Sequence, residues 1–322
     1  MNTNLVAADV RRLTPPQINI RASLRRLLQC AVFGCVLLSN AQAADQRPNI
    51  VLILAHDLGR EKIGCYGAKG QTPNIDQLAA EGIRYETAWS MLDGGRSHQA
   101  LIHGRYPSRL ANGQPTFAEL LIKAGYHRED HDFDRKLKLP AKRPYLLLCQ
   151  LPHKQEVERV DELVGQLARA TADENTFLLF TSANSEGARM DISAHVPFII
   201  RAPFLGKGGR VSRDLVDFTD LFPTIMDLAG IRAPADLKLD GVSLVPSLRG
   251  SDDPFEKRNW IVSETSGYRM ARDWHHLVDT NGRFHDLEKD PLQERKVSVL
   301  DKQAPHRQQR LQMILGRFAH EE

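Results

Sequence analysis

The strongest constraint on the fold is the run PNIVLILAHD at residues 48–57, which is apolar until its last residues. Continuous Ile, Val and Leu without alternation is typical of a central strand in a parallel sheet, where helices cover both faces. Ligands of such sheets bind beyond the carboxyl ends of the strands. We therefore predict a buried strand here and a site at His56 and Asp57.

Helices and further strands alternate with this first strand. Predicted helices lie at residues 72–82 and 116–125, in residues 157–167 and before Gly230, and predicted buried strands lie at 145–153, 177–184 and 196–203. Residues 127–144 contain almost no apolar side chains and are predicted to form a loop. This alternation predicts an α/β fold, a layered and mostly parallel sheet flanked by helices.

The pattern changes near the C-terminus. From Trp260 onward the chain consists of short strand-like pieces joined by polar turns, which is typical of a small antiparallel subdomain. We divide the chain into a leader at residues 1–43, an α/β domain at 44–258, and a small C-terminal subdomain with a tail at 259–322.

The leader has the layout of a secretory signal peptide. Three arginines, Arg21, Arg25 and Arg26, precede the apolar run LLQCAVFGCVLL, and small residues follow as far as Ala43. The apolar run is too short to span a bilayer, and no later stretch is long enough. We expect export to the periplasm or the medium, with no membrane span in the mature chain. A retained anchor or a misassigned start codon is the alternative.

Composition narrows the choice of partners. The formal net charge of +3 is too small to indicate a nucleic-acid partner, and hydrophobic and charged fractions of 42% and 26% are ordinary for a soluble protein. Only Cys65 and Cys149 follow the leader, which is too few for a disulfide framework. We expect no nucleic-acid partner and no disulfide scaffold.

Ten segments in order along residues 47–291 resemble the sulfatase family of the alkaline phosphatase superfamily. They are RPNIVLILAHDLG, GCYG, TPNIDQLAAEGIRY, HGRYPSR, LPH, DENTFLLFTSAN, VPFIIRAP, DLFPTIMDLAGI, LDGVSL and HDLEKDP. The resemblance implies an exported sulfate-ester hydrolase fold and a calcium-type metal at the strand ends. It also implies a formylglycine nucleophile, made from Cys or Ser in a C/S-x-P-x-R loop, and sulfated saccharides or aryl sulfates as substrates.

The metal ligands implied by the resemblance are only partly present. The family's Asp-Asp pair corresponds here to His56 and Asp57, and its Asp-Asn pair corresponds to Ala183 and Asn184. One carboxylate remains where the family has about three, so calcium binding is predicted to be weak or lost. His56 is either a ligand for a metal such as zinc or a loop histidine bonded to the backbone.

The nucleophile implied by the resemblance is missing. Alignment on HGRYP places Gly94 at the nucleophile, Arg96 at the family's Pro, and Ser97 and His98 at its Ser and Arg. Alignment from residues 87–90 gives Gly95 instead. Neither glycine can be oxidised to formylglycine, which is therefore not expected. Ser97 is the first substitute nucleophile to consider.

The cations that the family uses around sulfate are also reduced. His153 matches the family's histidine after the next strand and is predicted either to contact sulfate or to cap a turn. Two family lysines have no counterpart, one after Tyr126 and one before Val196, where Arg189 is the available cation. A weak anion site built from Arg96, His98, Arg105 and His153 is the remaining expectation.

Three functions are compatible with these residues. We favour a catalytically impaired sulfatase-like protein, because the losses cluster at strand ends. The alternative is an active sulfatase that hydrolyses saccharide or aryl sulfate esters through non-standard residues. A phosphodiesterase with a Ser or Thr nucleophile is less supported, because its zinc sites need more His and Asp at strand ends than this chain supplies.

Overall fold

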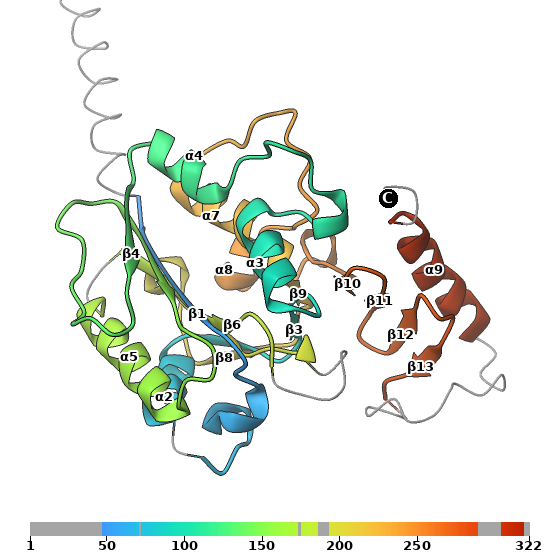
Figure 1. Ribbon diagram of the computed structural model, residues 1–322, viewed down its shortest axis with the longest axis horizontal. Coiled ribbons are helices and arrows are strands. Elements are labelled where there is room, and N and C mark those ends of the chain that lie inside the picture. Colours follow the sequence, from blue (N-terminus) through green and yellow to red (C-terminus); the bar gives the residue numbers. More distant parts are fainter. Residues whose placement is uncertain (1–46, 71, 173–174, 186–192, 289–303, 319–322) are drawn as a thin grey trace, which may run out of the picture. The chain divides into compact units, whose positions relative to one another are not determined.

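A seven-stranded sheet organises the computed structural model, which describes residues 47–70, 72–172, 175–185, 193–288 and 304–318 (Figure 1). The strands are β4 (His127–His131), β5 (Tyr145–Gln150), β1 (Asn49–Ala55), β6 (Thr176–Ser182), β7 (Phe198–Arg201), β2 (Ile83–Tyr85) and β8 (Arg210–Ser212), in spatial order. Neighbouring strands from β4 to β6 are parallel, as are β2 and β8, whereas β7 is antiparallel to both of its neighbours. The predicted mostly parallel sheet is confirmed.

Helices cover both faces of this sheet (Figure 1). They are α2 (Pro73–Glu81), α3 (Gly94–His103), α4 (Phe117–Lys123), α5 (Val157–Ala170), α7 (Leu221–Ala229) and α8 (Val245–Arg249). Successive side chains of a strand point to opposite faces. Accordingly, Ile50 and Leu52 of β1 pack with α3, α4 and α7, while Val51 and Ile53 pack with α2 and α5.

Short elements connect the layers. Single 3-10 turns occur at Arg60–Lys62, Gly64–Tyr66, Pro107–Arg109, Pro203–Leu205, Phe218–Asp220 and Pro254–Glu256, and β3 (Ala88–Trp89) pairs with β9 (Val216–Asp217).

The predicted C-terminal antiparallel subdomain is confirmed. Its sheet has the order β10 (Ile261–Glu264), β11 (Arg269–Arg272), β12 (His276–Asp279) and β13 (Phe284–Asp286), and helix α9 (Ala304–Gly316) packs on β11 and β12. The predicted leader at residues 1–43 lies outside the described residues. Within the described ranges, no helix combines the length and apolarity needed to cross a bilayer.

The prediction of a loop throughout residues 127–144 is wrong at its start. Strand β4 pairs in parallel with β5, from His127 opposite Tyr145 to His131 opposite Cys149. Its side chains are exposed or half-buried. An edge strand needs backbone pairing with only one neighbour, and charged side chains there protect the open edge from further pairing. The low apolar content of residues 127–131 therefore correctly predicted that their side chains are exposed or half-buried. It wrongly predicted a loop where the chain forms a strand.

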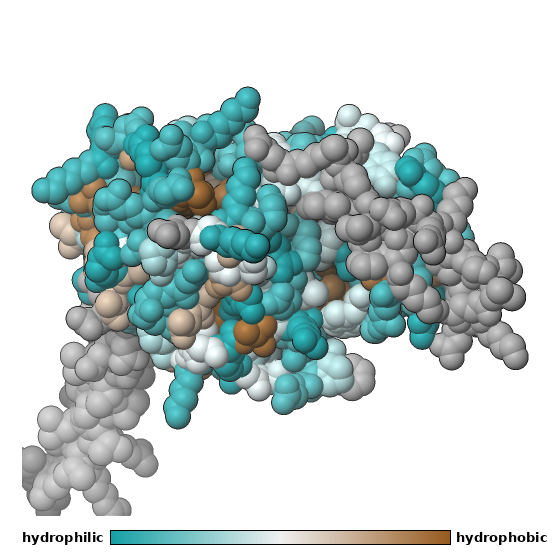
Figure 2. All heavy atoms as spheres, turned by 90° about the horizontal axis from the view of Figure 1, so that it is seen from below, coloured by the Kyte–Doolittle hydropathy of each residue, from teal (hydrophilic) through white to brown (hydrophobic). Residues whose placement is uncertain are grey.

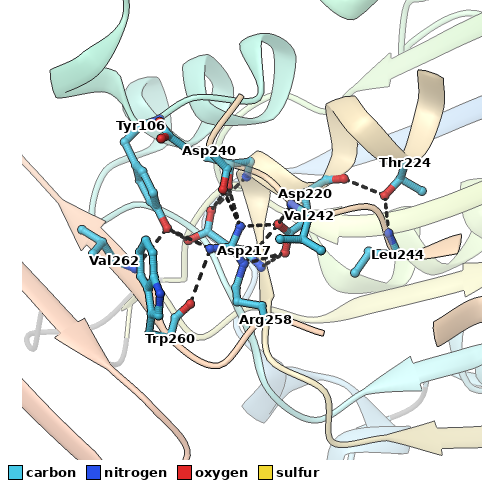
Figure 3. Close-up of polar contacts among 11 residues, drawn as sticks. Tyr106, Asp217, Asp220, Thr224, Asp240, Val242, Leu244, Arg258, Trp260 and Val262 are labelled. Carbon is cyan, nitrogen blue, oxygen red and sulfur yellow. Dashed lines mark hydrogen bonds and ion pairs between the residues drawn. The ribbon is translucent and has the colours of Figure 1, made fainter. Parts of the chain in front are cut away.

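A buried ion-pair network joins the chain after α3 to α7 and to the C-terminal sheet (Figure 3). We call Tyr106, Asp217, Asp220 and Arg258 the Arg258 network. The Arg258 Nε lies 3.1 Å from both carboxylate oxygens of Asp220, and the Tyr106 hydroxyl donates to Asp217 at 2.8 Å. Burial raises the pKa of Asp217 to about 6; Arg258 opposes that rise and the Asp220 charge adds to it.

The same network reaches the first C-terminal strand. The Tyr106 hydroxyl accepts a hydrogen bond from the Val262 backbone N–H in β10, and Arg258 donates to the Trp260 carbonyl. All four side chains of the network are almost completely buried. Buried charges of this kind are tolerated only when they are paired and hydrogen-bonded. The network therefore ties the C-terminal sheet to the segments after α3 and before α7 through a few specific contacts.

Candidate functional site

The carboxyl ends of β1 and β6 bring Asp57 and Asn184 together. The pairing of Ala55 with Ser182 places the residues that follow each strand side by side. The Asn184 amide donates to one carboxylate oxygen of Asp57 at 2.7 Å, and the other oxygen lies 2.9 Å from Nδ1 of His153. Asp57 has a φ of 57°, a left-handed conformation that non-glycine residues seldom adopt outside functional or tightly held positions.

Histidines border this carboxylate. The rings of His56 and His153 have centroids 4.5 Å apart. Burial lowers the pKa of His56, and His153 lowers it further, while Asp57 acts in the opposite direction. Partial burial raises the pKa of Asp57, but hydrogen bonds from His153 and Asn184 outweigh it and hold that pKa below its ordinary value. At neutral pH the site therefore contains one ionised carboxylate and a neutral His56.

Position 94 faces this group of side chains. Gly94 is the first residue of α3, and a Cβ at this position would lie 3.4 Å from Oδ1 of Asn184 and 3.5 Å from Nδ1 of His56. That Nδ1 is buried and has no hydrogen-bond partner among the described residues. Gly95 is exposed, and a Cβ there would approach only Asp93. Of the two glycines that align with the family's nucleophile, only Gly94 faces the strand ends. Being glycine, it supplies no nucleophilic atom.

The first turn of α3 uses two of the predicted site residues for other contacts. Asp93 caps the helix by accepting from the Arg96 backbone N–H at 2.8 Å. The Ser97 hydroxyl is buried and donates to the Asp93 carbonyl at 2.8 Å. The Arg96 guanidinium lies 3.8 Å from Glu264 of β10. Neither Ser97 nor Arg96 makes a hydrogen bond or ion pair with the strand-end residues.

His98 remains beside the site. It lies one helical turn after Gly94 and accepts a hydrogen bond from the Gln150 side chain at 2.9 Å. Burial lowers the pKa of His98, and His103 and Arg128 lower it further. Gln150 was not predicted from the sequence; a polar residue ending an apolar strand was the available signal. Arg105, predicted as part of an anion site, lies 3.8 Å from Asp240 instead.

The described donor set does not fit a calcium ion. Calcium takes six to eight oxygen ligands, whereas the strand ends offer the Asp57 carboxylate and the Asn184 amide, which already bond to each other. No three His, Cys, Asp or Glu side chains converge on one point in the described part of the chain. Residues 186–192, which include Arg189, lie outside the described residues. The affinity for calcium stays a prediction.

Comparison with known proteins identifies the family. A sequence model described as Sulfatase matches residues 48–134 and 153–231, about half of the chain. An ulvan-active sulfatase of Formosa agariphila is 24% identical over 74% of this chain and 66% of its own length, and human N-acetylgalactosamine-6-sulfatase is 23% identical over 73% of each. The chain therefore spans about two thirds to three quarters of these relatives.

Solved structures share the fold. A putative sulfatase from Bacteroides thetaiotaomicron superimposes with a TM-score of 0.72 at 17% identity, covering 85% of this chain and 93% of its own. The phosphonate monoester hydrolase of Agrobacterium radiobacter gives a TM-score of 0.71 at 16% identity, covering 86% and 96%. The resemblance to the sulfatase family is confirmed, and the chain belongs to that family.

Proposed function

We propose that this sulfatase-family protein binds sulfate esters of saccharides or aryl compounds at the carboxyl ends of β1 and β6, and that it is catalytically impaired. The observation that carries the proposal is Gly94, which faces Asn184 and His56 and has no side chain. Relatives named as an ulvan-active sulfatase and a hexuronate-2-O-sulfatase, and a fold neighbour solved with D-glucosamine-2-N,6-O-disulfate, support a sulfated saccharide as the ligand.

The chemistry explains why the missing groups matter. Sulfate-ester cleavage needs a nucleophile, a cation that balances charge on the sulfuryl oxygens, and an acid for the leaving alkoxide. Here His98, whose Nε2 accepts from Gln150, keeps Nδ1–H as a donor for a sulfate oxygen. His153 gives its Nδ1–H to Asp57 at 2.9 Å, so its Nε2 donates to sulfate only when the ring is protonated. These groups suit binding of an anion. They supply neither the nucleophile nor the concentrated positive charge of the usual reaction.

We predict that wild-type protein carries no aldehyde and has only background sulfatase activity. Peptide mass spectrometry should find residues 90–98 unmodified, even after coexpression with the formylglycine-generating enzyme, because Gly94 has no oxidisable side chain. Turnover of aryl sulfates and sulfated saccharides should equal that of a matched Asp57→Asn variant. Metal-dependent sulfate release by wild type alone would overturn this proposal in favour of the active alternative, and Ser97→Ala and His56→Ala would then identify the substitute groups.

We predict weak calcium binding, with a dissociation constant of about a millimolar or worse, because one carboxylate stands where the family has about three. Isothermal titration calorimetry with Ca²⁺ measures this dissociation constant. A parallel titration with Zn²⁺ is included because His56 and His153 are adjacent. A micromolar calcium site abolished by Asp57→Asn would contradict the expectation.

We also propose export, with removal of residues 1–43. The charged, apolar and small-residue pattern ending at Ala43 supports this proposal. Mass spectrometry of the N-terminus of protein recovered from the envelope or the medium should find Ala44 first. An intact Met1 on most molecules would exclude cleavage.

A further inference from the structure

Most of the connection between β4 and β5 lies outside the ranges that match the family. Residues 135–152 fall between the two ranges that match the family, and residues 132–144 form the connection itself. It starts at the carboxyl end of β4. Because β4, β5, β1 and β6 are parallel, that end lies on the sheet edge where Asp57 and His153 are found.

This 132–144 segment has an unbalanced charge. It contains five basic and two acidic residues. Both acids have arginine partners, Asp132 at 3.3 Å from Arg135 and Asp134 at 3.1 Å from Arg159 of α5. The three lysines of the segment are exposed and have no ion-pair partner among the described residues: Lys136, Lys138 and Lys142. The segment therefore presents uncompensated positive charge to solvent.

The segment is anchored by alternating residues. Phe133, Leu137 and Leu139 pack against the core under α5, and the Arg159 guanidinium lies over the Phe133 ring at 4.7 Å. Lys136 and Lys138 alternate with the two anchored leucines and are exposed. Anchoring holds the lysine backbone in place before a ligand arrives, which reduces the entropy lost on binding. The face of the molecule in Figure 2 is largely hydrophilic, with hydrophobic residues in small separated areas.

We propose that Lys136, Lys138 and Lys142 form a second contact surface for a sulfated polysaccharide whose chain extends from the strand-end site. This inference rests on the proposed function and names the polymer as its ligand class. A sulfated polymer carries closely spaced permanent negative charges, and binding to lysines releases its condensed counterions, as happens with other polyanions. A second contact also raises the effective concentration of the chain at the first site. Exposed Lys154, which follows His153 in the sequence, adds a cation next to a residue of the strand-end site.

The test compares two triple variants of the full chain. One is Lys136→Ala, Lys138→Ala, Lys142→Ala. The matched control is Lys69→Ala, Lys207→Ala, Lys238→Ala, which removes the same charge from exposed lysines elsewhere. We expect the first variant to bind dextran sulfate about 10- to 100-fold more weakly than wild type at moderate salt, with a shallower dependence on salt. The control should lose about threefold or less. Equal unfolding temperatures exclude misfolding as the cause.

Small probes separate this inference from the proposed function. Glucose 6-sulfate should bind wild type and the first variant equally, because a monosaccharide reaches only the strand-end site. Suppose that wild type binds dextran sulfate through the three lysines and yet does not bind glucose 6-sulfate. That result would refute the proposed strand-end site and leave a polyanion-binding surface. The inference would be overturned if both triple variants lost the same affinity for dextran sulfate. It would also be overturned if duplex DNA bound wild type through the same lysines as tightly as dextran sulfate does.

Discussion

Replacing Arg258 with methionine is expected to lower the free energy of unfolding by about 3 to 5 kcal/mol at pH 7. The substitution leaves Asp217 and Asp220 buried without a counter-ion, and both side chains are completely inaccessible to solvent. It also removes the contact of Arg258 with the Trp260 carbonyl, so the C-terminal sheet should loosen first. Urea denaturation followed by fluorescence measures the loss, and hydrogen exchange of β10 amides reports the local opening.

The matched control for Arg258→Met is Asp217→Asn, which keeps the size and shape of the side chain and removes its negative charge. Because Asp217 has its pKa raised to about 6 when folded, ionisation of its carboxyl disfavours the folded state. The stability contributed by its protonated form is complete below a pH of about 4 and is lost as pH rises through 6. The stability difference between wild type and Asp217→Asn should therefore fall by about 2 kcal/mol between pH 4 and 7. A pH-independent difference would show that Asp217 is ionised in the fold throughout.

Rebuilding the nucleophile motif alone is expected to restore modification without restoring activity. The variant Gly94→Cys, Arg96→Pro, His98→Arg recreates the C-x-P-x-R pattern, and position 94 has room for a side chain beside His56 and Asn184. Proline at 96 removes the N–H that Asp93 caps, at a cost of about 1 kcal/mol. The aldehyde should appear by mass spectrometry after coexpression with the modifying enzyme, while aryl sulfate turnover stays near background.

Adding His56→Asp and Ala183→Asp to this variant should raise turnover at least about tenfold in calcium, because a bound metal contributes several kcal/mol of charge stabilisation and each 1.36 kcal/mol changes a rate tenfold. Activity should remain below that of a complete sulfatase, since the family's lysines are still missing. Calcium should also raise the unfolding temperature of the five-substitution protein and not that of the three-substitution protein. Equal turnover by both proteins would show that the metal carboxylates are not what limits the reaction.

Periodicity and composition predicted most of the α/β layer. The run at residues 48–57 became β1 because continuous apolar side chains are stable only where both faces of a strand are covered. The helix predicted at residues 72–82 is α2, with Ile75, Leu78 and Ala79 buried as its spacing indicated. Strand β4 and the antiparallel direction of β7 were not predicted, because pairing with a neighbouring strand, and not local composition, decides both.

At the site, the sequence by itself determined which side chains are available. No arrangement of the chain can give Gly94 a nucleophilic atom or Ala183 a carboxylate. Only the tertiary structure decided which remaining groups meet, since side-chain contacts depend on register and helix direction. It placed Gly94 and not Gly95 toward Asn184, directed Ser97 into the first turn of α3, and joined Asp57 to His153 across 96 positions of the chain. Hydrogen bonds between residues so distant in sequence leave no local pattern, because each partner is selected by the packing of strands and helices that hold it.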